Sequence, residues 1–281
     1  MDGPGAFSFP LEGLMALIFD TFMFGSAESE TDILECRLRE LENVPNLHHV
    51  IVEAEITHRG DPKPALWFEE HKERFAAWGE RITYVRVPAG SLPSAAVSPD
   101  PWSREYAQRE YCHAGLDEAD PDDIVLHGDA DEIPSPGAIK ALSSGKELPF
   151  PAVFQMRLCM YAVDWLHPLP WHGTIRTKVR SVGSFASLRG MRNSLPTIMN
   201  GGSHLSWMGG VEAHRAKLET HCHLEMTEET KEALRSGEWL RDGQHSDGHK
   251  LEPVDVDETW PRWVYERQCP QNWFRPRKEA A

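Results

Sequence analysis

The sequence lacks the marks of a secreted or membrane-spanning protein. Its 281 residues contain five cysteines, an odd number, and no C-x-x-C pair. This argues against a disulfide framework and predicts reduced thiols in a cytoplasmic protein. No apolar run reaches the roughly 20 residues that span a bilayer. Residues 1–14 have neither the basic start nor the apolar stretch of a secretory signal, so we expect a flexible N-terminal extension there.

Two further absences narrow the range of ligands. The chain has 29 lysines and arginines against 44 aspartates and glutamates, a net charge of −15. This argues against a nucleic-acid or anionic membrane surface, because both need basic side chains. Neither a G-x-G-x-x-G motif nor a Walker loop is present, so a glycine-rich phosphate loop is not the means of binding a nucleotide.

Apolar and helical patterns alternate along the first half of the chain. Strands are predicted for residues 16–24, 49–53, 81–87 and 124–128, and helices for 30–41, 69–78 and 102–116. Such alternation is typical of an α/β fold with a parallel sheet and crossover helices. The second half is less regular. A strand is predicted over 152–163, loops over 166–173 and 201–210, and helices over 213–218 and 227–236.

The most informative stretch is DDIVLHGDADEIPSP, residues 122–136. A short apolar run predicts a buried strand, and Pro134 and Pro136 prevent its continuation. Asp129 and Asp131 therefore lie at the carboxyl end of a strand, where open α/β sheets bind ligands. Because they are two residues apart, they point to the same side, and paired carboxylates there suit Mg²⁺ or Mn²⁺. The plain alternative is a solvated acidic loop.

Six short motifs follow one another in the order of a known family. D-x-F-x-F begins at Asp20, and L-E-x-R-L-x-E-L, T-x-x-G-x-x-K-P and W-x-R-E-x-x-Q-R begin at Leu34, Thr57 and Trp102. D-x-D-E-I-P covers residues 129–134. G-x-H-x-S from Gly202 then precedes G-G-x-E, a lysine and an H-x-E that ends at residue 225. Over residues 16–235 the chain resembles glycosyltransferase family 17.

The resemblance implies a GT-A-like fold, with a Rossmann-like, mostly parallel sheet flanked by helices and an irregular acceptor-side half. We expect a nucleotide-binding half over residues 15–140, an acceptor and catalytic half over 141–250, and a tail over 251–281. The implied reaction is inverting transfer of N-acetylglucosamine from a UDP-sugar donor to a hydroxyl of a carbohydrate or another acceptor, with Mn²⁺ or Mg²⁺ as cofactor. The Pro- and Ser-rich segment 88–101 is expected to close over the donor.

The resemblance also implies roles for individual residues. Asp131, Asp129 and His223 would bind the metal ion. Glu212, at the start of a predicted helix that would keep it ionised, would be the general base, with Glu225 and Asp247 as rivals. The implied donor-binding residues are Asp20, Glu53, Lys63, Arg109 and Asp129. The residues implied to contact the donor sugar or the acceptor are Glu132, His204, Ser206 and Trp207.

Each assignment has a plainer alternative. Lys63 and Arg109 could be exposed charges on a loop and a helix, His204 a structural histidine, and Trp207 part of the core. Two other functions also fit the sequence. One is a metal-dependent phosphohydrolase built on the two aspartates and on histidines. The other is a non-catalytic sugar-binding protein on the same fold.

Overall fold

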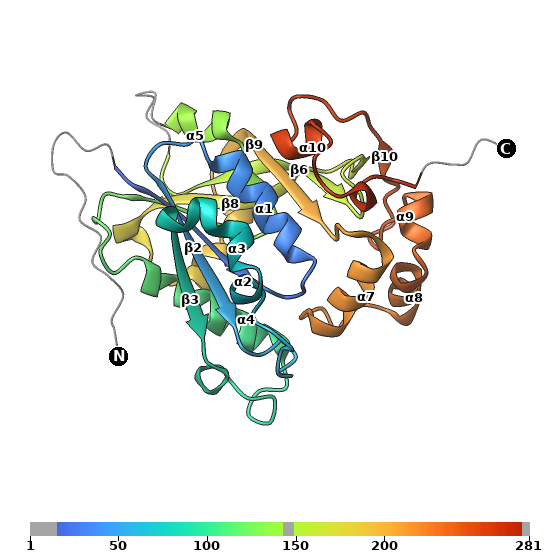
Figure 1. The fold of residues 1–281 in the computed structure, drawn as a ribbon, viewed down its shortest axis with the longest axis horizontal. Helices are drawn as coiled ribbons and strands as arrows, with labels where there is room; N and C mark the ends of the chain where they lie inside the picture. Colours follow the sequence, from blue (N-terminus) through green and yellow to red (C-terminus); the bar gives the residue numbers. More distant parts are fainter. Residues whose placement is uncertain (1–15, 143–148, 277–281) are drawn as a thin grey trace.

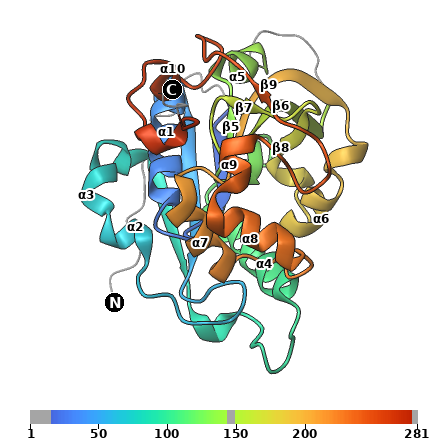
Figure 2. The ribbon, with the colours of Figure 1, turned by 90° about the vertical axis from the view of Figure 1, so that its right-hand side faces the viewer.

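The computed structural model describes residues 16–142 and 149–276, and the extension predicted for residues 1–14 lies outside these ranges. One mixed β-sheet runs through the molecule, with helices on both faces (Figure 1, Figure 2). Its strands follow the order β10-β7-β6-β8-β4-β1-β2-β3, and β5 and β9 pair beside this path. Within the described ranges, no helix combines the length and apolar character needed to cross a bilayer.

Four strands form the parallel sheet that the sequence predicts. They are β1 (Ile18–Phe24), β2 (Leu47–Ala54), β3 (Ile82–Val87) and β4 (Ile124–Asp129), paired in parallel in the order β4-β1-β2-β3. The segments that connect them contain α1 (Glu30–Leu41), α2 (Trp67–Glu70), α3 (Lys72–Phe75) and α4 (Pro101–Glu110). The single helix predicted for 69–78 is wrong. The backbone leaves the helical region at His71, with φ −106° and ψ 17°, and separates α2 from α3.

The second half extends this sheet with strands of mixed direction. They are β5 (Glu132–Pro134), β6 (Ala152–Met160), β7 (Trp165–Leu166), β8 (Trp171–Lys178), β9 (Thr197–Ser206) and β10 (Glu252–Pro253). The loops predicted over 166–173 and 201–210 are right only in part, because residues 167–170 and 207–209 are irregular whereas β8 begins at Trp171 and β9 continues to Ser206. Gly202 in β9 has φ +141°, and a Cβ atom there would lie 2.1 Å from the carbonyl oxygen of Ile133. The glycine permits close pairing of β9 with β5.

In the part of the chain that the structure describes, six helices accompany these strands. They are α5 (Pro136–Leu142), α6 (Phe185–Gly190), α7 (Gly210–Thr220), α8 (Glu228–Ser236), α9 (Glu238–Asp242) and α10 (Arg262–Tyr265). The capped helix predicted for 227–236 is confirmed, since the Thr227 hydroxyl accepts a hydrogen bond from the Thr230 amide at 3.2 Å. Short 3₁₀ turns also occur, at 76–81, 89–91, 111–115, 179–181, 192–194 and 271–273.

The central parallel strands β1 and β2 are buried on both faces. Phe22 and Phe24 of β1 pack with Leu34 and Leu38 of α1 on one side. Phe19 of β1 belongs to a second apolar cluster on the other side, which includes α6. Because successive side chains of a strand alternate between the two faces, one strand supplies both cores and its backbone is held rigidly.

Residues 251–276 are part of the folded domain. Trp260, Trp263 and Trp273 belong to the apolar cluster that covers β1 and α1, and Trp273 is fully buried. In Figure 2 this C-terminal segment, with α10, lies beside α1. These tryptophans fall in the segment that we predicted as a C-terminal tail, residues 251–281. They pack onto the domain because burying such large aromatic rings against an existing core is strongly favourable.

Candidate active site

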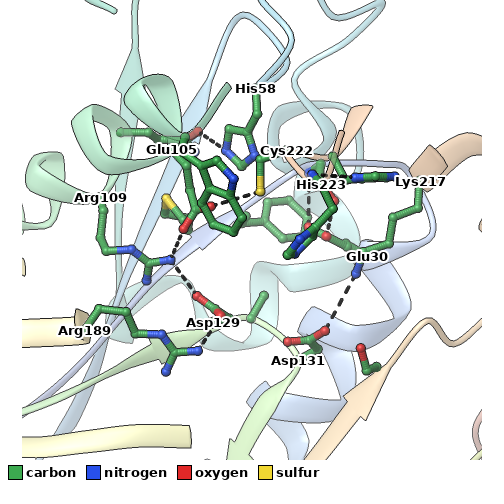
Figure 3. Close-up of a pocket in the computed structure, with 18 of the residues that line it drawn as sticks. Glu30, His58, Glu105, Arg109, Asp129, Asp131, Arg189, Lys217, Cys222 and His223 are labelled. Carbon is green, nitrogen blue, oxygen red and sulfur yellow. Dashed lines mark hydrogen bonds and ion pairs between the residues drawn. The ribbon is translucent and has the colours of Figure 1, made fainter. Parts of the chain in front are cut away.

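A cavity of about 900 Å³ lies at the carboxyl ends of β1 and β4 (Figure 3). The turn after β1 and residues 129–131 line one part of it. Residues of α4 and α6, the end of β9 and a segment that runs from Lys217 to His223 line the rest. This is the edge of the sheet where the sequence predicts ligand binding, because parallel strands end together there.

Helices α4 and α6 bring two arginines to this edge. The Asp100 carboxylate caps α4 by accepting a hydrogen bond from the Trp102 amide at 3.1 Å. Glu110, the last residue of α4, accepts hydrogen bonds from the first two backbone N–H groups of α6, at 3.1 and 2.8 Å. Each helix is thus fixed at its start, and Arg109 of α4 and Arg189 of α6 point at residues 129–131 (Figure 3).

Asp129 lies between these two arginines. Its Oδ1 is 2.9 Å from Nη2 of Arg109, and its Oδ2 is 2.6 Å from Nη2 of Arg189. Burial raises the pKa of Asp129, but the two guanidinium groups more than offset this and hold the pKa well below its usual range. The carboxylate is therefore ionised and fixed in orientation, with both oxygens engaged. Arg109 also binds Glu105 at 2.7 Å and is thus a positioning residue.

Asp131 lines the same cavity with looser partners. Nε2 of His204 lies 3.2 Å from one oxygen. Nζ of Lys217 lies 3.8 Å from the other, and Figure 3 shows this pair. Burial raises the pKa of Asp131, but the His204 ring and the Lys217 ammonium lower it below its usual value. Both carboxylates are therefore ionised, and Asp131 is better placed than Asp129 to bind a further ligand.

The predicted donor-binding residue Asp20 lies inside the core. It is fully buried and forms two hydrogen bonds with Arg37, at 2.6 and 2.8 Å, and one with His49, at 2.8 Å. Arg37 in turn donates to the carbonyl oxygens of Asp129 and Glu132, at 2.9 and 2.7 Å. Contrary to the prediction, Asp20 does not face a donor; it holds the turn that carries the two aspartates.

Two other predicted contacts are also buried. Glu53 caps α2 by accepting hydrogen bonds from the Trp67 and Phe68 amides, at 2.8 and 3.0 Å. Glu132 is fully buried and accepts from Nη1 of Arg189 at 2.9 Å and from Nε1 of Trp171 at 2.6 Å. These carboxylates support the cavity wall and are not exposed to a sugar.

Glu212, the predicted base, lies outside the cavity. Its side chain is 83% exposed and pairs with Arg215 at 2.7 Å. The reason is helical geometry: Glu212 and Lys217 are five residues apart on α7, so they project about 140° apart around the helix axis. Since Lys217 faces the cavity, Glu212 faces solvent. The sequence of α7 does not tell which of these two side chains faces the cavity, because that depends on how the helix packs on the domain.

The remaining predicted residues line the cavity: Lys63, His204, Ser206, Trp207 and His223. The Lys63 ammonium donates to the Gly25 carbonyl oxygen at 2.8 Å, and burial lowers its pKa. His223 is 44% exposed, and its Nδ1 lies 2.6 Å from Oε1 of Glu225. The predicted metal ligand is therefore oriented by a carboxylate of its own.

Sequence reasoning missed three features of this site. Arg189 and Arg192 follow no motif; Arg192 lines the cavity, 4.5 Å from the ring centroid of Trp171. A cluster of His58, Glu105 and Cys222 also lies in the wall. Its members are far apart in the sequence. Only the W-x-R-E spacing of α4, which places Glu105 one turn before Arg109, gave any signal for it.

The positions of possible metal ligands limit where an ion could bind. In the described ranges, ligand atoms of three or more His, Cys, Asp or Glu side chains gather within 4.8 Å in two places, and neither includes Asp129, Asp131 or His223. Oxygen-binding ions such as Mg²⁺ take one or two protein carboxylates and complete their shell with substrate phosphates. Asp131 fits that requirement, whereas the oxygens of Asp129 are engaged by arginines.

Comparison with known proteins identifies the class. The model of glycosyltransferase family 17 matches residues 12–237. The chain therefore belongs to glycosyltransferase family 17, and the predicted membership is confirmed. No curated protein matches the chain.

The solved structures similar to it include two of bacterial proteins. One is Staphylococcus aureus TarS 1–349, with 10% identity over 79% of this chain and 69% of that one, at a TM-score of 0.36. The other is the apo-form glycosyltransferase GlyE of Streptococcus pneumoniae TIGR4, with 11% identity over 85% of this chain and 45% of that one, at a TM-score of 0.32.

Proposed function

We propose that the chain is an inverting, metal-dependent glycosyltransferase of GT-A type. It moves N-acetylglucosamine from a UDP-sugar to an acceptor hydroxyl. The observation that carries the proposal is the placement of Asp129 and Asp131 on one wall of a large cavity at the end of β4, in a chain of this family. The five cysteines are buried free thiols, which supports a reducing compartment, the cytoplasm.

The donor's diphosphate binds cationic side chains of the cavity. Lys63, Arg192 and Lys217 line it, and the Lys217 ammonium also lies 5.4 Å from the ring centroid of Trp207. Together they offer hydrogen-bond donors and positive charge to phosphate oxygens. His204, Ser206 and Trp207 lie next to these cations along the end of β9 and contact the transferred sugar.

Asp131 is the protein ligand for Mn²⁺ or Mg²⁺, and Asp129 positions the nucleotide beside it. A bound ion would stabilise the charge that develops on the diphosphate leaving group. Asp129 keeps its orientation because Arg109 and Arg189 hold both of its oxygens.

The general base is His223, in place of Glu212. Its Nδ1 is bonded to Glu225 at 2.6 Å, which directs a proton to Nδ1 and leaves Nε2 free to accept one from the acceptor hydroxyl. Partial burial raises the pKa of Glu225, but the hydrogen bond from His223 lowers it below its usual value, so Glu225 stays ionised and orients the ring.

Two variants test the metal and donor assignment. Asp131→Asn should weaken the Mn²⁺-dependent affinity for UDP at least about tenfold in calorimetry, ~1.4 kcal/mol. Arg215→Met on the outer face of α7 should leave it unchanged. Equal, metal-dependent UDP affinity in a folded Asp131→Asn variant would falsify the assignment.

Two further variants test the base. His223→Gln should keep UDP affinity and lose turnover by roughly 10²-fold or more, the usual scale of acid–base catalysis. Glu212→Gln, which removes the exposed carboxylate, should turn over normally. The opposite pattern, with Glu212→Gln inactive and His223→Gln active, returns the role to Glu212. Weak UDP binding by His223→Gln would instead restore it as a metal ligand.

A further inference from the structure

A second group of histidines lies at the C-terminal end of the domain. His167 follows β7, and His245, Asp247 and His249 come from the loop between α9 and β10. Nε2 of His167 is 2.9 Å from Oδ2 of Asp247, and Nδ1 of His245 is 2.8 Å from Oδ1. The ligand atoms of these three residues lie within 4.8 Å of one another. Nδ1 of His249 is 3.2 Å from Oδ2 of Asp247.

The local backbone builds this group. Gln244 and Lys250 form an antiparallel bridge, and the His245 amide donates to the His249 carbonyl oxygen at 3.1 Å. Gly248 turns the chain with φ +88°. The H-x-D-x-H segment 245–249 is therefore a tight turn that brings His245 and Asp247 together opposite His167, with His249 beside Asp247.

Hydrogen bonding alone leaves this group incompletely satisfied. Nδ1 of His249 is buried, and in the described part of the chain it has no hydrogen-bond partner with acceptable geometry, although Asp247 is near. A buried polar atom without a partner is costly. Nδ1 of His167 lies 3.2 Å from the carbonyl oxygen of Leu169. The same Nδ1 also lies 3.1 Å from the Leu169 amide, which can only donate to it, so a metal on Nε2 requires the tautomer in which Nδ1 donates to the carbonyl oxygen, the usual arrangement of ligating histidines.

We propose that His167, His245 and Asp247 bind a zinc ion. Two imidazole nitrogens and one carboxylate oxygen supply three of the four ligands of a zinc site, with Zn–N distances of about 2.0–2.1 Å, and His249 beside Asp247 or a water would complete the shell. The ion ties the 244–250 loop to the segment after β7. Since His245 also lines the active-site cavity, the site fixes one of its walls. The zinc proposal does not depend on the proposed sugar transfer being correct.

The other ligand-rich cluster suits zinc less well. Glu105 is neutralised by Arg109 at 2.7 Å, and the Cys222 thiol donates to Glu105 at 3.1 Å. Burial raises the pKa of that thiol above its usual value, so it stays protonated, whereas zinc binds the thiolate. His58 in that cluster is already bonded to Gln108 at 3.2 Å. The two clusters are distinguishable because only one contains sulfur.

The full chain, loaded with Zn²⁺ and desalted, should retain one zinc per molecule by elemental analysis. X-ray absorption should show nitrogen and oxygen neighbours at about 2.0–2.1 Å and no sulfur at about 2.3 Å. Asp247→Asn and His167→Gln should each weaken zinc affinity at least about tenfold. His71→Gln, which removes an imidazole paired with an exposed glutamate elsewhere, should keep it.

Asp247 lies on an exposed loop, so Asp247→Asn should fold even if His167→Gln does not, and circular dichroism checks this. Zinc that disappears in Cys222→Ser, or a sulfur shell, would place the ion at the other cluster and overturn the proposal. Zinc lost in Asp131→Asn would place it at the donor site and do the same. If the wild type does not retain zinc, the proposal is wrong and these residues form only a hydrogen-bonded cluster.

Discussion

Replacing Arg189 by methionine is expected to destabilise the protein strongly. Its guanidinium binds Glu132 through Nη1 at 2.9 Å and Nη2 at 2.5 Å, and Asp129 at 2.6 Å. The Glu132 side chain is fully buried, and that of Arg189 is 8% exposed. Methionine would fill much of the space but leave the Glu132 carboxylate without its cation. Asp129 would keep Arg109 and some contact with solvent, so Glu132 bears most of the cost.

The magnitude follows from this burial. Removing one partner of a buried ion pair costs about 3–5 kcal/mol, because the remaining charge is uncompensated. For a chain of 281 residues, this lowers the melting temperature by about 5–9 °C. Arg215→Met is the matched control, since its partner Glu212 is 83% exposed and exposed pairs contribute about 1 kcal/mol or less.

Urea and thermal unfolding, followed by circular dichroism, measure both variants. Adding Glu132→Gln to Arg189→Met should recover about 1–2 kcal/mol, because a neutral amide needs no cation and can still accept from Trp171. If Arg189→Met cost no more than Arg215→Met, or if Glu132→Gln made it worse, the uncompensated charge would not be the cause and the reasoning would fail.

Three further outcomes are expected. Burial lowers the pKa of His214 to about 4. Between pH 6.5 and 4 the unfolded chain therefore binds a proton that the folded chain does not, and stability should fall as the pH drops. His214→Gln should reduce that slope by one proton's contribution in unfolding titrations, since other histidines such as His48 and His221 have lowered pKa values too, and an unchanged slope would exclude a contribution from His214. Gly202→Ala should cost about 2–4 kcal/mol by forcing a Cβ against the Ile133 carbonyl oxygen, whereas Gly79→Ala, with open space around it, should cost little; similar costs would contradict this. Hydrogen exchange over residues 88–101 should slow when UDP and Mn²⁺ bind, and equal exchange with and without them would refute loop closure.

Local patterns in the sequence were enough to predict part of the active site. The alternation of strands and helices predicted β1 to β4 because periodicity reports directly which face of an element is buried. The short apolar run before Asp129, with prolines after it, placed two carboxylates at the end of β4. Both features depend only on residues that are close together in the sequence, so the sequence alone is enough to predict them.

Tertiary structure decided which side chains reach the cavity. Glu212 and Lys217 share one helix, and only the docking of α7 turns Lys217 inward and Glu212 outward. Asp20 matched the family motif as well as Asp129 did, yet Arg37 and His49 meet it inside the core. Arg189 reaches Asp129 from 60 residues away, and Trp273 packs on the first helix from the far end of the chain. These contacts join elements that are distant in sequence, and they form because buried charges and apolar surfaces need partners. No local sequence pattern predicts which partners meet.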